Sequence, residues 1–178
     1  MSTDPFVHIA RIGRRMAWLT TGLFWLWVPA LAVFVVVIRD MGSFPGLMIG
    51  VAPRVLPPLV AVAAWAVLTL VSLPALWGLW ALKRLFEGYA AGAIFTVAAA
   101  RRLRHCGYAL VAGGIEGPFA SALLSVALTF DLPKGSRMLV VSFSSNDIVL
   151  LVVGALLLTV ARVMGEAARI AEENAGFV

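Results

Sequence analysis

Charged side chains are scarce in this chain of 178 residues. Asp, Glu, Lys and Arg together make up 13% of the sequence, whereas apolar residues make up 62%, and the mean hydropathy is +0.99. Soluble domains usually carry about 25% charged residues. The composition therefore excludes an ordinary water-soluble domain and indicates a protein that folds in a bilayer.

Cysteine and histidine are almost absent as well. The lone Cys106 excludes an intramolecular disulfide framework. His105 and Cys106 are adjacent, which is not the ligand spacing of a zinc site. No histidine lies near the polar cluster at residues 142–147, so a serine nucleophile there would lack a base. We expect neither metal nor cofactor, and no enzymatic activity.

Four long apolar runs are what the sequence offers instead. A membrane-spanning helix needs about 20 apolar residues, and only the last run is short, since it is uncharged from Ile148 to Ala161. We extend it to Gly165, with Arg162 reaching toward the headgroups. The pattern predicts an all-α integral membrane four-helix bundle, one domain over residues 1–178, with approximate spans 17–38, 55–82, 106–130 and 147–165.

Basic residues flank these runs unevenly. The first run is too long for a signal peptide, so it is counted as a span. The N-terminal segment, the loop over residues 83–105 and the C-terminal tail are rich in Lys and Arg, and the other two loops are poor in them. By the positive-inside rule, both termini of this membrane protein lie in the cytoplasm. Membrane lipid is the partner expected for these charges, and direct nucleic-acid binding is not.

The two outer loops differ in pattern. Residues 39–54 hold several turn formers, whereas SRMLVVSF at 136–143 is a short apolar run compatible with a small extracytoplasmic β pairing. The cluster SSND at 144–147 predicts the N-cap of the last helix. In the inner loop, Thr96 predicts the cap of the helix that leads into the third span.

Glu116 is the one charged residue inside the third apolar run. It lies ten residues after Cys106, which places it about 15 Å into a helix. Two interpretations remain open: a protonated acid that stabilises helix packing, or a titratable site on a proton or cation pathway. The expected polar partners of Glu116 are Thr69 and Ser72. A stripe of small residues every four positions predicts the packing face of this helix: Ala109, Gly113, Gly117, Ser121 and Ser125.

The inner loop and the tail carry the remaining charge. A lipid-facing basic segment is the simpler interpretation, and a docking surface for a cytoplasmic partner is the functional one. The candidate docking residues are Arg101, Arg102, Arg104, Glu172, Glu173 and Asn174.

Two cytoplasmic stretches carry a family resemblance: LFEGYAAGAIFTVAAARRLRHCGYALVAG and GEAARIAEENAGFV. Together they resemble the bacterial family known as domain of unknown function 2975. The resemblance implies four spans and no established activity. It also implies, as a partner, a small cytoplasmic helix-turn-helix regulator. The matching positions are Leu85, Phe86, Gly92, Ile94, Phe95, Thr96, Leu103, Arg104, Gly107, Glu173, Asn174 and Val178.

Two functions from different classes follow. The leading hypothesis is a non-enzymatic membrane signalling or interaction protein with a cytoplasmic docking surface. The alternative is a small transporter or ion-coupling subunit centred on Glu116. The glycine-rich face of the third helix is also compatible with a homo-oligomer.

Overall fold

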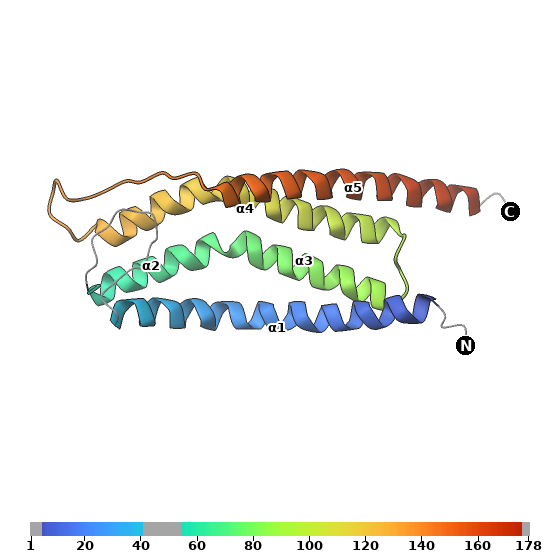
Figure 1. Ribbon diagram of the computed structural model, residues 1–178, viewed down its shortest axis with the longest axis horizontal. Coiled ribbons are helices and arrows are strands. Elements are labelled where there is room, and N and C mark those ends of the chain that lie inside the picture. Colours follow the sequence, from blue (N-terminus) through green and yellow to red (C-terminus); the bar gives the residue numbers. More distant parts are fainter. Residues whose placement is uncertain (1–4, 41–54, 176–178) are drawn as a thin grey trace.

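The computed structural model describes residues 5–40 and 55–175, and this part of the chain is all-helical (Figure 1). Each of the four apolar runs lies within helical structure. The helices are α1 (Pro5–Asp40), α2 (Pro58–Val71), α3 (Leu73–Ala90), α4 (Val97–Thr129) and α5 (Ser145–Ala175).

Side-chain caps begin the two longest apolar helices after α1. The Thr96 hydroxyl accepts a hydrogen bond from the Ala99 amide at 3.1 Å, as expected for an N-cap. At α5 the Asp147 amide donates to the Ser144 hydroxyl at 3.2 Å, and the Ser144 amide donates to Asp147 Oδ2 at 2.8 Å. This reciprocal arrangement is a capping box. Both predicted helix starts are confirmed.

The second apolar run, expected as one span over residues 55–82, forms two helices bent by 40°. The break lies at Ser72, between α2 and α3. Pro74 has no amide proton, so the carbonyl of Leu70 loses its helical partner. The Ser72 hydroxyl donates to the Thr69 carbonyl at 2.8 Å, which satisfies one backbone group beside the break.

The helices pack in a row instead of around a shared core. α1 packs against α2 and α3, these two pack against α4, and α4 packs against α5 (Figure 1). Among the described helices, α5 contacts α4 alone. The expected four-helix bundle is therefore not what the structure shows, because a bundle requires the last helix to close against the first.

Large apolar side chains cover the outside of this row. On α5, for example, Val152, Leu156 and Val160 are 54%, 61% and 48% exposed. An exposed apolar surface of this size is unfavourable in water. Within the described residues, α4 and α5 are each long and apolar enough to cross a membrane, and the bent pair α2–α3 makes a third candidate span.

One apolar cluster joins α2 to the C-terminal end of α4. Val60 and Ala64 of α2 lie in it with Leu124 and Leu128 of α4, and Val140 packs against it from the segment that precedes α5. That segment is extended, but no strand pairs with it in the described chain. The predicted β pairing over residues 136–143 is wrong for this part of the molecule, because the segment lies along a helix. The other loop of that prediction, residues 41–54, lies outside the described residues.

Candidate functional site

The N-terminal half of α4 meets α5 through glycines. A Cβ on Gly154 would lie 2.9 Å from the Val111 amide nitrogen and 3.0 Å from the Gly107 carbonyl oxygen. A Cβ on Gly107 would lie 2.8 Å from Cγ of Leu158. Such distances leave no room for a side chain, so the two backbones approach each other as they do at small-residue contacts in membranes.

The predicted stripe of small residues is divided among three partners. Ala109 contacts α3, where a Cβ on Gly78 would lie 2.9 Å from the Ala109 Cβ, whereas Gly113 has only a loose contact with Leu150 of α5 at 3.8 Å. Gly117 lies against Asp147, whose carboxylate an added Cβ would overlap. Sequence reasoning missed the packing role of Gly107 and Gly114, because they are offset by two and one positions from the four-residue repeat that was counted on α4, and it missed Gly154, because no repeat was sought on α5.

The C-terminal end of the stripe binds backbone amides of the segment before α5 instead of packing against a helix. The amide of Ser142 donates to the Ser121 hydroxyl and that of Val140 to the Ser125 hydroxyl, both at 3.0 Å. Beyond them, the amide of Met138 donates to the Thr129 hydroxyl at 3.3 Å. We call the three hydroxyl-bearing residues Ser121, Ser125 and Thr129 the hydroxyl row.

The repeat lengths of helix and extended chain explain this match. Four helical residues advance about 6 Å, and two extended residues advance about 6.6 Å. Every second amide of the segment therefore meets every fourth side chain of α4. The periodicity that the sequence shows is real, and its partner at this end is an extended segment.

Glu116 is half-buried on α4 and lies level with the α2–α3 break. Counting six residues along each helix from the Gly78–Ala109 contact brings Ser72 opposite Ile115, one residue from Glu116. No hydrogen bond joins Glu116 to its expected partners in the described chain. Thr69 donates instead to the Trp65 carbonyl at 2.8 Å, and Ser72 donates to Thr69.

Asp147 is a second acid at this height, and sequence reasoning treated it only as part of a cap. It is 7% exposed and lies at Gly117, the next residue after Glu116. Its carboxylate is occupied by the amide of Ser144. The signal that it is buried was the distribution of glycines on α4, which shows where a neighbour must come close.

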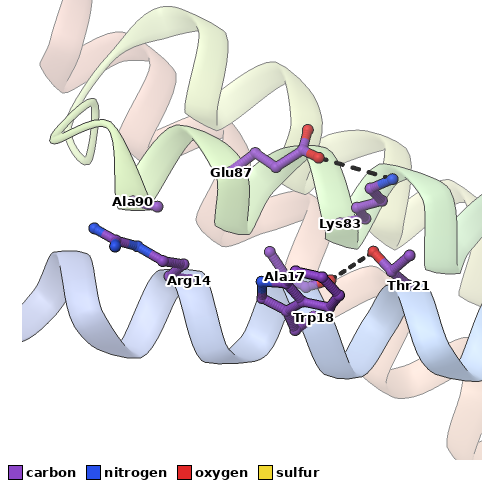
Figure 2. A pocket seen from close by; sticks show the side chains of 7 residues that line it. All are labelled: Arg14, Ala17, Trp18, Thr21, Lys83, Glu87 and Ala90. Atoms are coloured by element: carbon purple, nitrogen blue, oxygen red, sulfur yellow. Dashed lines mark hydrogen bonds and ion pairs between the residues drawn. The ribbon is translucent and has the colours of Figure 1, made fainter.

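Basic side chains from four helices lie at one height, near the end of the molecule where α4 begins and α5 ends. The Arg102 guanidinium donates to the Arg84 carbonyl at 2.8 Å, so this predicted docking residue instead joins α4 to α3. Arg14 and Lys83 line a common pocket between α1 and α3 (Figure 2). We call this set the basic belt: Arg14, Lys83, Arg84, Arg102, Arg104 and Arg162.

The pocket between α1 and α3 has a volume of about 390 Å³ and one internal ion pair. Lys83 Nζ lies 3.8 Å from Glu87 Oε1, and Trp18 lies on the α1 side of the same pocket (Figure 2). Nearby, the Arg84 guanidinium lies 5.2 Å from the centre of the Trp80 ring. Indole rings beside cations are typical of a membrane interface.

A larger groove of about 760 Å³ lies between the N-terminal part of α4 and the C-terminal part of α5. Arg104, Arg162 and Glu172 line it, so two predicted docking residues are brought together here. Arg169 also lines it, but Arg169 is held by Glu166 and by Glu173, the latter at 3.5 Å. Arg104 and Arg162 have no ion pair within the described residues. The other candidates Arg101, Glu173 and Asn174 are exposed near this end.

Metal-binding chemistry finds no support in the described residues. They contain no group of three or more His, Cys, Asp or Glu side chains placed to hold an ion. Cys106 is a free, buried thiol on α4, and the His105 ring packs beside Trp77 with 5.7 Å between ring centres.

The comparisons with known proteins give one match. No curated protein and no solved structure matches the chain. The family model described as "Protein of unknown function (DUF2975)" matches residues 12–176, nearly the whole length. This agrees with the resemblance carried by the inner loop and the tail. The chain therefore belongs to the DUF2975 family.

Proposed function

We propose that this protein is a non-enzymatic interaction or signalling protein of the bacterial inner membrane. It crosses the membrane four times with both termini in the cytoplasm, and it binds a cytoplasmic partner in the groove between α4 and α5. The single observation that carries the proposal is this groove, because it holds, beside the exposed tail, two arginines that form no ion pair with any described residue.

The basic belt supports this orientation. Its residues come from α1, α3, α4 and α5, yet the contacts and pockets that they share bring them to one height. Cations gathered at one height mark the cytoplasmic boundary of a membrane protein. The groove lies at this boundary and is accessible from the cytoplasm.

The charges of the groove select the chemistry of the partner. Glu166 and Glu173 are engaged by Arg169, whereas Arg104 and Arg162 remain available. A partner that presents acidic side chains would form charge-assisted hydrogen bonds with these two guanidinium groups. The family resemblance suggests a small helix-turn-helix regulator, and an acidic surface on that regulator would leave its basic DNA-binding face free.

Photocrosslinking from the groove tests the proposal. A benzoylphenylalanine in place of the exposed Thr159, which lines the groove, is compared with one in place of Phe143 at the opposite end. We expect a soluble protein adduct from Thr159 alone, and its loss in the double variant Arg104→Glu, Arg162→Glu. The matched control, Lys134→Glu with Arg137→Glu, should leave the adduct intact. Adducts with lipid only, or an adduct insensitive to charge reversal in the groove, would refute docking.

A second function, ion or proton coupling, is favoured by one observation. Two acids, Glu116 and Asp147, lie at the same height as the α2–α3 break. Broken helices at the bilayer midplane often surround ion sites in transporters. In proteoliposomes, coupling predicts a pH-dependent flux that Glu116→Gln removes and that the charge reversals in the groove leave unchanged. A wild-type flux that Glu116→Gln leaves unchanged would exclude this residue from the pathway, and a wild-type flux no higher than that of empty liposomes would refute coupling.

A further inference from the structure

The start of α5 does not align with the outer end of α4. α5 begins beside Gly117, because Asp147 and Leu151 contact Gly117 and Gly114. α4 continues for twelve residues beyond Gly117, to Thr129. Along this last part of α4 its partner is the extended segment instead of α5.

The basic belt gives a reference height from which this offset can be measured. Arg104 and Arg162 line the same groove, and Gly165 lies beside Ala100, so Arg162 already stands at the inner boundary. From Arg104 to Gly117 is 13 residues, which is about 20 Å of helix. The hydrocarbon region is about 30 Å thick. α5 therefore begins about 10 Å short of the outer boundary.

The hydroxyl row covers the missing distance. Ser121 and Ser125 stand 17 and 21 residues beyond Arg104, at heights of about 26 and 32 Å. The amides of Ser142 and Val140 bond to them. Non-helical backbone is tolerated at membrane depth where protein groups satisfy it, and these hydroxyls satisfy alternate amides of the segment.

The side chains of the segment alternate in the way that a lipid contact requires. Val140 packs against the apolar cluster of α2 and α4. The residues between the bonded ones point away from α4: Leu139, Val141 and Phe143 are 70%, 62% and 73% exposed. All three are apolar, which suits acyl chains and is unfavourable in water.

We propose that the fourth crossing of the membrane is composite: α5 spans the inner part, and residues 140–143 complete the outer part in extended form, with Val141 and Phe143 against lipid acyl chains. The inference rests on the four-crossing topology proposed above. The uncharged part of α5, from Ile148 to Ala161, covers about 20 Å, and the extended segment continues this apolar surface toward the outer boundary. The hydroxyl row takes the role that helical hydrogen bonds have elsewhere in the crossing.

Cysteine accessibility in intact cells or right-side-out vesicles tests this inference. In a Cys106→Ala background, single variants Ser136→Cys, Leu139→Cys, Val141→Cys and Phe143→Cys are treated with a membrane-impermeant maleimide. All four positions are exposed on the protein surface, so differences in rate report the solvent. We expect position 136 to react from outside, and positions 141 and 143 to react at least about tenfold more slowly, because a thiol in lipid ionises poorly.

The control position separates the two proposals. If position 136 reacts only from the inside, the four-crossing topology fails. If position 136 reacts from outside and positions 139, 141 and 143 react as fast as position 136, the topology holds and the composite crossing is overturned.

Nitroxides at the same positions distinguish lipid from protein as the covering medium. Collisions with oxygen, which concentrates in lipid, should exceed collisions with a water-soluble nickel chelate at positions 141 and 143. Low collision rates with both reagents would mean that protein covers the segment, as in a second copy of this chain, and would overturn the lipid contact.

Discussion

The two halves of α4 use small side chains for different purposes. In the N-terminal half, glycines have no side chain, so the backbone of α5 approaches Gly107 and Gly114 closely. In the C-terminal half, Ser121, Ser125 and Thr129 present hydroxyls to an extended chain. A helix satisfies its own amides and needs only space, whereas an extended segment needs acceptors. The spacing differs accordingly: Gly107 and Gly114 are seven residues apart, whereas the hydroxyl-bearing residues follow one another every four.

The largest expected effect comes from adding a side chain at the glycine contact between α4 and α5. Gly154→Ala places a Cβ against backbone atoms of Val111 and Gly107 that cannot move aside independently. We expect the free energy of unfolding in detergent to fall by about 3 kcal/mol, since overpacking costs about 1–3 kcal/mol or more.

Gly22→Ala is the matched control for that prediction. Gly22 lies on α1 with no atom within 4 Å of an added Cβ. Alanine there should stabilise the helix by about 0.5–1 kcal/mol, because glycine is the poorer helix former. Equal effects of the two substitutions would contradict the close α4–α5 contact.

A smaller effect is expected from removing one hydroxyl of the hydroxyl row. Ser125→Ala leaves the Val140 amide without its acceptor and should lower the free energy of unfolding by about 1 kcal/mol. A cysteine at position 141 should also react faster with maleimide, because the segment is released. Thr159→Val is the control, since the Thr159 hydroxyl bonds only to its own helix at Ala155. The expected fall in the free energy of unfolding without faster labelling at position 141 would contradict the role of the hydroxyl row in holding the segment.

The smallest effect is expected on α3, at the ion pair that Lys83 of the basic belt forms with Glu87. Glu87→Gln removes the partner of Lys83 at a half-exposed site, where the ion pair is 3.8 Å long. A pair at this spacing contributes about 0.3–0.5 kcal/mol at low salt. The difference between variant and wild type should disappear in high salt because exposed charges are screened. An effect above that of Ser125→Ala would mean that the belt stabilises the fold as well as orienting it.

Local chemistry was predictable from the sequence, and the choice of partners was not. Thr96 and Ser144 cap helices as expected, because capping depends on residues within one turn. The short apolar run at 136–143 predicted a β pairing, since such a run is typical of an extended chain but does not show what binds its amides. The chain does become extended, and the acceptors are side chains of a helix.

The candidate site shows the same limit. Arg104 and Glu172 meet in the groove, although their separation along the chain gives no hint of it. Arg102 was grouped with Arg104 by position, but its guanidinium reaches Arg84 because the two residues point to different sides of α4. Each residue along a helix is rotated by about 100° from the one before it, so Arg102 and Arg104, two residues apart, face different sides. Only the packing decides which side faces the groove.

The packing order of the helices has a consequence for how the protein is made. α1 packs against α2 and α3, these against α4, and α4 against α5, so each helix contacts only its neighbours in this chain order, with α2 and α3 acting as one unit (Figure 1). A helix leaving the ribosome finds its partner already present in the membrane. Assembly can follow synthesis from the N-terminus onward, and the extended segment with α5 is the last part to be added.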